Sequence, residues 1–326
     1  MAAVLQWIAL FIVLAALLVG VWVMSAWRRT KQELARMLTV WGTKTSPWCT
    51  TAADDGEPVC QALHDPAVLS VDEIPTANSG VPTRLMYGIK AIAHFVRNGT
   101  VHAADDNATQ VTLIPDVTAS PPLAAVCVSA DGTSALVVIR GTMTASDLLA
   151  DVKFNAVPIP GQDGCTAHSG IWKLYADALQ SQVAGALPET VTDVFICGHS
   201  LGGALAHLVG FGLLSANNNG GQSRRRRVGI VAVAPPRVLN PVAAALSQKN
   251  AAFVNTMINL ADPVPTLPFT FMPRKTSDGL PPSNYVHVGE IAVIHKPTTD
   301  LISCHLLPAY ASGAAGAQVV AAARGT

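Results

Sequence analysis

The sequence predicts an α/β fold in which helices cover both faces of a mostly parallel sheet. Three observations lead to this prediction. Strand-like and helix-like apolar runs alternate through the second half of the chain, as they do in repeated βαβ units. The motif GHSLG stands at the junction between one such strand and the next helix. The 326 residues are 50% hydrophobic and only 13% charged, which suits a large core and excludes a disordered or fibrous chain.

Charge and cysteine content exclude two classes of function. Lys and Arg together number 21, as do Asp and Glu, so the formal net charge is zero and nucleic-acid binding is not expected. The six cysteines form no CxxC pair and no Cys/His group at the spacing of zinc ligands. We therefore expect no structural metal site.

The N-terminus carries an apolar run that is long enough to cross a bilayer. From Trp7 to Met24 there is no charged, amide or hydroxyl side chain, and as a helix this run would extend about 27 Å. A cleaved signal peptide is the alternative. However, no charged residue precedes the run, and the best cleavage site, after Ala26, has Met24 at the minus-three position. Residues 1–30 are therefore predicted to be an uncleaved transmembrane anchor with its basic flank.

Basic residues just after the apolar run predict its orientation. This flank contains one acidic residue, Glu33, and four basic residues, Arg28, Arg29, Lys31 and Arg36. Because positive residues stay on the cytosolic side, we predict a single-pass membrane protein with a cytosolic catalytic domain.

Two features would suit the opposite orientation. Glycosylation sequons begin at Asn98 and Asn107, and Cys49 and Cys60 could close a disulfide loop in an oxidising compartment. Sequons arise often by chance, so the charge rule carries more weight.

The folded domain is expected over residues 81–326, after a tether of irregular structure over residues 31–80 that prolines and acids interrupt. Its first helix is predicted over residues 84–96, where apolar side chains recur at helical spacing. Two apolar runs joined at Asp131-Gly132 then predict a β-hairpin.

Helices and strands are predicted to alternate after the hairpin. Helices are expected near residues 146–154, 171–186, 201–216 and 241–249, and strands over residues 191–197, 228–234 and 251–260. This order is typical of parallel strands joined by crossover helices. The Ala- and Gly-rich tail over residues 311–326 shows no clear pattern. The loop arginines from Arg224 to Arg227 are either simply solvated or dock on anionic lipid head groups.

The GHSLG motif, Gly198 to Gly202, follows a predicted strand and begins an apolar helix. This context is that of a nucleophile elbow, a sharp strand-to-helix turn on which Ser200 stands. Glycines flank the serine because its backbone is strained and a neighbouring Cβ would collide with the adjacent strand and helix. The N–H of Leu201 would face the negative charge that develops on a substrate carbonyl. The alternative is a glycine-containing turn without catalysis.

A serine nucleophile needs a histidine base and a carboxylate. In folds with a nucleophile elbow, the acid follows the serine in the chain and the histidine follows the acid. Asp262 directly follows the strand predicted over residues 251–260, at the edge where such sites assemble, and is the best acid. The other downstream acids, Asp278, Glu290 and Asp300, are expected to be loop carboxylates, and Asp300 is also a candidate helix cap.

Three histidines follow in the right order. His287 and His295 lie in an alternating, strand-like segment, where histidine is usually a sheet residue. His305 lies in a loop-to-helix segment near the end of the domain and is the favoured base, with His287 second.

Over residues 120–310 the chain resembles the class 3 lipases, the fungal triacylglycerol-lipase type of α/β-hydrolase. The motifs that carry the resemblance occur in order and are VVIRGT, ADVKF, AHSGIW, GHSLGGALA, PRVLN, NLADPVPTLP, YVHVGE and CHLLPAY. The resemblance implies an α/β-hydrolase fold with Ser200 as nucleophile, Asp262 as acid and His305 as base. It also implies a second oxyanion donor beside Leu201, namely Thr142, whose other role would be a helix cap.

The resemblance also includes two structural residues, but the chain departs from the family pattern at two places. Asp151 and His168 are similar to the family's structural aspartate and histidine. The family usually has glycine at the position of Ala234, which we expect to be a tolerated packing change. The lid segment over residues 143–150 has few large apolar residues, so a strong interfacial lid is not expected.

The sequence therefore predicts a membrane-anchored serine hydrolase that cleaves carboxylic esters of tri-, di- or monoacylglycerols at a membrane surface through an acyl-enzyme. No metal or organic cofactor is expected, because water is the only second substrate. The alternatives are a phospholipase A-type esterase, an acyltransferase, and a catalytically silent membrane scaffold that keeps the fold.

Overall fold

The computed structural model describes residues 74–99, 110–115, 122–141, 155–218, 225–268, 285–298, 301–314 and 316–320. The predicted membrane anchor and the helix predicted near residues 146–154 lie outside these ranges. Within them, no helix is both long and apolar enough to span a bilayer.

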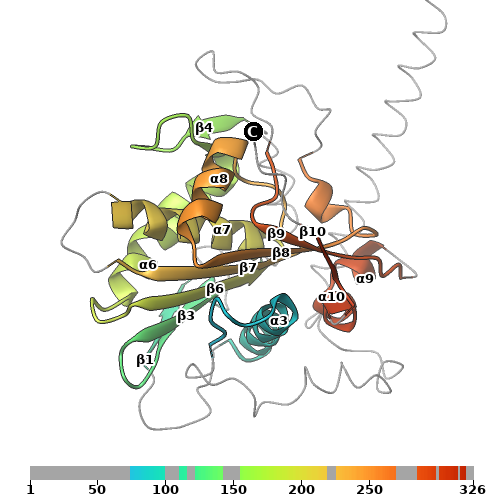
Figure 1. Cartoon of the computed structure of the whole chain (residues 1–326), viewed down its shortest axis with the longest axis horizontal. Coiled ribbons are helices and arrows are strands. Elements are labelled where there is room, and N and C mark those ends of the chain that lie inside the picture. The colour runs from blue at the N-terminus through green and yellow to red at the C-terminus, as the bar shows by residue number, and fades with distance from the viewer. Residues whose placement is uncertain are drawn as a thin grey trace, which may run out of the picture.

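The described strands form one large, mostly parallel sheet (Figure 1). Its eight strands, in spatial order, are β1 (Gln110–Ile114), β2 (Ala124–Val128), β3 (Ser134–Ile139), β6 (Asp193–His199), β7 (Arg227–Val233), β8 (Phe253–Asn259), β9 (Glu290–Ile294) and β10 (Gln318–Val320). Pairing is parallel from β3 to β9 and antiparallel at both edges. A separate ribbon joins β4 (Ala156–Pro158) to β5 (Thr166–His168).

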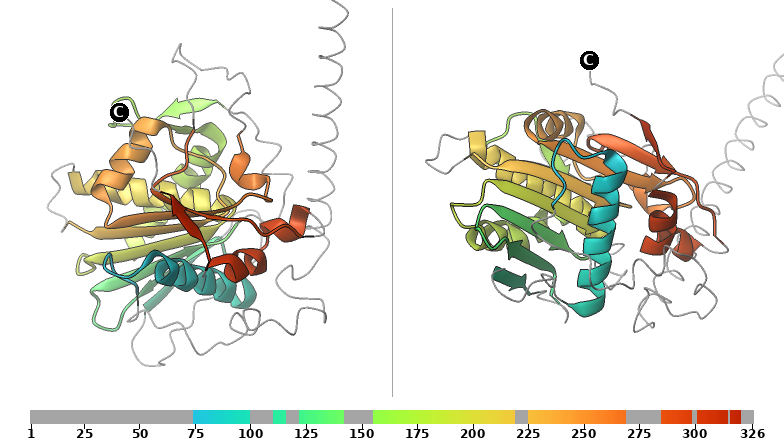
Figure 2. Two further views of the ribbon diagram at one scale, coloured as in Figure 1. Left: turned by 45° about the vertical axis from the view of Figure 1, so that its right-hand side comes forward. Right: turned by 60° about the horizontal axis from the view of Figure 1, so that its bottom comes forward.

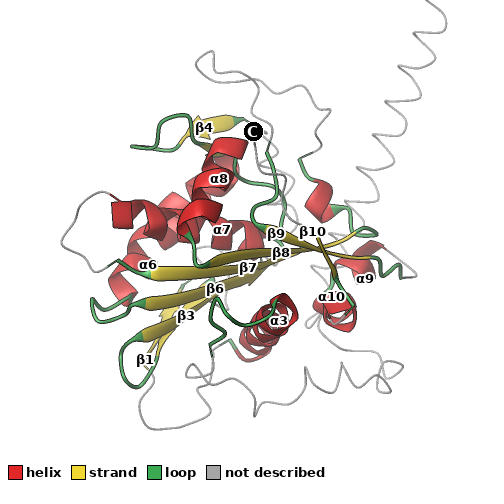
Figure 3. Cartoon of the chain, viewed as in Figure 1, coloured by secondary structure: helices red, strands yellow, loops and turns green. Residues whose placement is uncertain are grey.

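Helices cover both faces of this sheet, as predicted (Figure 3). On one face lie α5 (Ser169–Leu174), α6 (Gln180–Ala186), α7 (Leu201–Asn218) and α8 (Pro241–Asn250). The other face carries α3 (Val81–Asn98) and α10 (Leu307–Ala314), which lie side by side (Figure 2). Neighbouring residues of β6 therefore enter different cores: Ile196 packs in the α7 core, and Phe195 in the α3 core. Burial on both faces explains why the central strands are continuously apolar.

The predicted hairpin is confirmed in β2 and β3, which pair in antiparallel register. Its turn is closed by the carboxylate of Asp131, which accepts hydrogen bonds from Ser129 Oγ at 2.6 Å and from the backbone N–H of Thr133 at 2.9 Å. Gly132 has φ +71°, a left-handed conformation that glycine adopts without cost.

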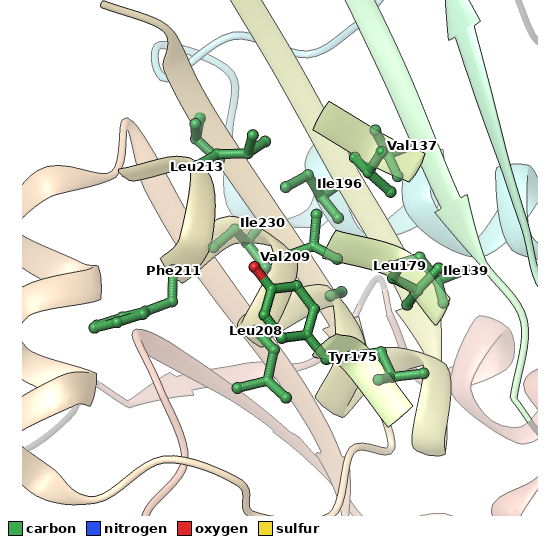
Figure 4. Packing of buried hydrophobic residues seen from close by; sticks show 14 of the residues in the cluster. Val137, Ile139, Tyr175, Leu179, Ile196, Leu208, Val209, Phe211, Leu213 and Ile230 are labelled. Atoms are coloured by element: carbon green, nitrogen blue, oxygen red, sulfur yellow. The ribbon is translucent and has the colours of Figure 1, made fainter. Parts of the chain in front are cut away.

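The helix predicted over residues 171–186 is interrupted. Between α5 and α6 runs a π-helical turn, Tyr175–Leu179. Tyr175 is buried among side chains of α7 and the sheet (Figure 4). A Cβ at Gly212 of α7 would lie 2.0 Å from the Tyr175 hydroxyl, so the glycine makes room for the ring.

Three sequence-based expectations differ from the structure. The tail without a clear pattern contains the end of α10 and strand β10. The strand expected around His287 and His295 is shorter than the pattern, because β9 covers only Glu290–Ile294 and leaves both histidines outside it.

The third difference concerns the arginine run. The Arg226 guanidinium donates to the carbonyls of Leu187 and Pro188 at 3.2 Å each, and Arg227 forms an ion pair with Asp193 at 2.6 Å. Asp193 and Arg227 pair at the first residues of two parallel strands, the edge opposite Ser200. Arg226 thus links the start of β7 to the end of α6, and Arg227 links β7 to β6. Arg225 and Arg227 are nevertheless exposed, as the solvated interpretation predicts.

Close packing of α3 on the sheet yields a stability prediction. A Cβ at Gly88 would lie 2.8 Å from Val231 Cγ1, so we expect Gly88→Ala to lower the free energy of unfolding by about 1–3 kcal/mol through overpacking. The matched control is Gly185→Ala in α6, where a Cβ meets nothing within 4 Å and helix propensity should raise stability by about 0.5–1 kcal/mol. Urea denaturation of both variants measures the difference. Equal effects would contradict the close approach of α3.

Candidate active site

Ser200 lies at a strained turn between β6 and α7. Its φ is +58°, a left-handed conformation that costs a non-glycine residue about 1–2 kcal/mol. Hydrogen bonds on both sides hold the turn: the Ser200 N–H donates to the Val233 carbonyl at 2.9 Å, and its carbonyl accepts from Gly203 N–H at 2.9 Å. The serine is thus fixed at the carboxyl edge of the sheet.

The two glycines of the motif are required by contact, as the sequence predicts. A Cβ at Gly198 would lie 2.1 Å from the Gly202 carbonyl oxygen. A Cβ at Gly202 would lie 2.4 Å from the carbonyl oxygen of Ile139, at the end of β3. No side chain fits at either position without moving backbone.

Ala234, which follows the neighbouring strand β7, is a second residue with a left-handed backbone at this edge. Its φ is +53°, and its N–H donates to the Met257 carbonyl at 2.9 Å. The departure from the family's usual glycine therefore involves backbone conformation as well as packing, because Ala234 is also fully buried. Alanine at this position carries a strain of about 1–2 kcal/mol that glycine would not.

Asp262 and His305 form a buried pair. Asp262 follows β8, and His305 is the last residue of α9 (Leu301–His305). Nδ1 of His305 lies 2.6 Å from Oδ2 of Asp262, and each residue is only 2% exposed. Because a carboxylate only accepts, Nδ1 donates, and the opposite ring nitrogen, Nε2, is the one suited to accept a proton.

Two further groups hold the Asp262 carboxylate. Its Oδ1 accepts from the backbone N–H of Val264 at 2.9 Å, and its Oδ2 accepts from the Tyr310 hydroxyl at 2.6 Å. Burial, and next the charge of Asp262, raise the pKa of Tyr310 well above its ordinary value, so the phenol keeps the proton that it donates. Sequence reasoning missed Tyr310, although a loop-to-helix segment was predicted here, because no local pattern shows which group its hydroxyl reaches.

Asn259 connects the acid to the base and was also missed. Its side-chain amide donates to the carbonyls of Lys296 and Cys304, both at 3.0 Å. Its oxygen accepts from the N–H groups of Lys296 at 2.9 Å and Ala261 at 3.2 Å. One side chain thereby links the turn before Asp262 to the helix that carries His305.

The second candidate base, His287, lies elsewhere. Its Nε2 donates to the Pro265 carbonyl at 2.9 Å, which supports the acid loop from outside. Burial, followed by the nearby charge of Arg237, lowers the pKa of His287 to about 4, so it is neutral near pH 7. The structure therefore brings His305, and not His287, to Asp262. His295 is exposed, and Glu290 pairs with Arg84 at 3.6 Å.

Of the two predicted oxyanion donors, Leu201 lies within the described residues. Leu201 is the first residue of α7, where backbone N–H groups have no intrahelical acceptor. A Cβ at Gly141 would lie 3.0 Å from the His199 carbonyl oxygen, so the end of β3 packs against the elbow. Thr142, the next residue, lies outside the described residues, as do Asp151 and the lid segment over residues 143–150.

The predicted structural residue His168 is buried. Its ring nitrogen accepts from the Ile171 N–H at 3.5 Å at the start of α5, and its ring lies 5.7 Å from that of Tyr285. Cys304 is also buried, with its sulfur 3.1 Å from Thr298 Oγ1.

Comparison with known proteins identifies one matching family and several similar folds. Residues 136–272 match the family model described as Lipase (class 3). Lipase II from Rhizopus niveus is similar with a TM-score of 0.50 and 22% identity, over 67% of this chain and 81% of that one. The Rhizomucor miehei lipase propeptide complex is similar with a TM-score of 0.50 and 20% identity, over 80% of each chain. No curated protein sequence matches. These structural likenesses show an α/β-hydrolase fold.

Two buried histidines, His207 and His287, predict how the stability of the fold depends on pH. His207 of α7 lies 3.2 Å from Thr256 Oγ1 through its Nε2, and burial, with a smaller effect of His287, lowers its pKa to about 3. Both histidines have folded pKa values below the unfolded value of about 6.5, so the unfolded chain binds more protons at acidic pH. Folding is therefore destabilised as the pH falls through 6.5 toward 4.

We expect the free energy of unfolding to drop by about 2 kcal/mol per histidine between pH 7 and pH 5. Urea denaturation at both pH values should show a smaller drop in His207→Gln than in the unaltered protein. Between pH 8 and pH 7 these residues should contribute little in either protein. An equal drop in both proteins between pH 7 and pH 5 would contradict the assignment.

Proposed function

We propose that this chain, whose residues 136–272 match the Lipase (class 3) family model, is a serine carboxylic ester hydrolase of that family. In this proposal it cleaves the ester bonds of tri-, di- or monoacylglycerols at a membrane surface through an acyl-enzyme. The observation that carries this proposal is the buried Asp262–His305 pair, at 2.6 Å, in the same molecule as a serine on a strained elbow. The nucleophile, base and acid proposed are Ser200, His305 and Asp262.

In this proposal the hydroxyl of Ser200 attacks the ester carbonyl while Nε2 of His305 takes its proton. Asp262 fixes the imidazole through Nδ1 and stabilises the imidazolium that forms. The developing oxyanion is bound by the N–H groups of Leu201 and Thr142. The alcohol leaves with the proton from His305, and water then hydrolyses the acyl-enzyme by the same route.

The environment of Asp262 supports its role. A buried carboxylate is stable only when several donors compensate for lost hydration. Asp262 has Val264 N–H, Tyr310 hydroxyl and His305 Nδ1 around it. This set holds the carboxylate in one orientation, which in turn fixes the ring of His305.

The apolar run from Trp7 to Met24 and its basic flank support membrane anchoring as part of the proposal, with the catalytic domain on the cytosolic side. A lipid ester as substrate fits an enzyme held at the surface where such esters reside. Phospholipase and acyltransferase activities on the same triad would be separated by assay on individual lipid classes.

The direct test is Ser200→Ala in the full-length protein. We expect loss of hydrolysis of a short-chain nitrophenyl ester and loss of fluorophosphonate labelling, because the covalent route has no nucleophile. The matched control is Ser247→Ala, which removes another buried hydroxyl, on α8, and should keep both activities. Labelling that persists in Ser200→Ala would assign the nucleophile elsewhere. An unaltered protein that neither hydrolyses esters nor reacts with the probe would be a silent scaffold.

Topology provides a second test. With a cytosolic domain, the protein made in eukaryotic cells should show no mobility shift on glycosidase treatment, and removal of residues 1–30 should release an active soluble hydrolase. Asn98 is exposed at the end of α3, so its sequon is open to glycosylation if the domain enters the lumen. A glycosidase-sensitive band that disappears in an Asn98→Gln, Asn107→Gln double variant would reverse the orientation.

A further inference from the structure

His199, the residue before the nucleophile, contacts the base directly. It is the last residue of β6 and is 2% exposed. Its Nε2 lies 2.8 Å from the backbone carbonyl oxygen of His305, across a sequence separation of 106 residues. A carbonyl oxygen only accepts, so Nε2 of His199 donates this hydrogen bond.

The two imidazole rings also pack against each other. Their centroids are 4.8 Å apart with an interplanar angle of 39°, and the ring of Tyr310 meets His199 edge-on at 6.3 Å. Two residues therefore hold His305 through three contacts: Asp262 at Nδ1, and His199 at both the backbone carbonyl and the ring.

The backbone of His199 is fixed by the same elements that fix Ser200. It pairs with Val233 in the β6–β7 register, and the next N–H, that of Ser200, donates to the Val233 carbonyl at 2.9 Å. A movement of the elbow would thus move the nucleophile and the donor to His305 together. The dipeptide His199-Ser200 therefore carries both the proposed nucleophile and a hydrogen-bond donor to His305.

We infer that His199 is a positioning residue for proton transfer, which holds the imidazole of His305 in register with Ser200 through the carbonyl hydrogen bond and ring contact. This inference rests on the proposed function. It assigns to the variable position of the GxSxG motif a role that the motif itself does not require. His199 touches the base and not the reacting ester, so it acts through His305.

The charge state of His199 suits this role. Burial, followed by the charge of His305, lowers its pKa well below the ordinary 6.5. His199 is therefore neutral when His305 becomes positively charged during the reaction. A second cation in contact with His305 would oppose that step, whereas a neutral N–H donor does not.

The test separates the donor from the ring in the full-length protein. Gln has an amide nitrogen at about the reach of Nε2, Asn has one that is a bond shorter, Phe keeps a ring without a donor, and Ala has neither. We expect kcat for a nitrophenyl ester to fall about 10²-fold in His199→Ala and His199→Phe with KM within about twofold, because misplacement of a reacting group by an ångström costs this much. His199→Gln should recover at least tenfold of that loss, and His199→Asn much less.

His207→Ala is the matched control, since it removes an equally buried histidine that faces Thr256 away from the triad. It should lower the melting temperature with kcat of the folded protein unchanged. If Ala and Phe at position 199 prevent folding, the Gln and Asn pair decides. Gln no more active than Asn, or Ala with unchanged kcat, would overturn the inference.

The outcomes also distinguish this inference from the proposed function. Activity lost in Ser200→Ala but unchanged in every His199 variant would overturn the positioning role alone. An unaltered protein without esterase activity and without probe labelling would overturn the proposed function itself.

Discussion

The left-handed backbone at Ser200 is the constraint on which the rest of the site depends. A turn this tight leaves no room for side chains, so Gly198 and Gly202 face each other and the end of β3 at distances that no Cβ could occupy. The strain is compensated by the elements on either side. Strand β6 is buried on both faces and α7 is almost completely buried, so the turn between them cannot relax without opening the core.

On the other side of the site, hydrogen bonds hold Asp262 and His305 in position. Asp262 lies in a turn after β8 and His305 at the end of the five-residue helix α9, and burial makes every unsatisfied polar group there costly. Asn259 satisfies four backbone groups with one amide, and Tyr310 bridges the start of the acid turn to the carboxylate. His199 joins this network to the elbow. The site is therefore one rigid unit assembled from three distant parts of the chain.

Sequence patterns predicted the features that depend on local order. The hairpin at Asp131-Gly132, the helices over α3, α7 and α8, and the central parallel strands all follow from periodicity and turn residues. Features that depend on distant contacts escaped prediction. The π-helical turn between α5 and α6 lies where Tyr175 packs on Gly212, and the Arg226 guanidinium donates to carbonyls that follow α6.

The same distinction divides the site. Ser200 could be identified because its chemistry requires a local backbone shape, and that shape requires glycines at fixed spacing. Asp262 and His305 were placed by chain order and by their position after strands, a weaker signal that left His287 as an alternative until the contact at 2.6 Å settled which histidine meets the acid. Asn259, Tyr310 and His199 have no local signature, because each is defined only by the atoms that it reaches. Supporting residues of this kind become visible only when the fold brings their partners together, and in the proposed mechanism they keep Ser200 and His305 at the distance that proton transfer requires.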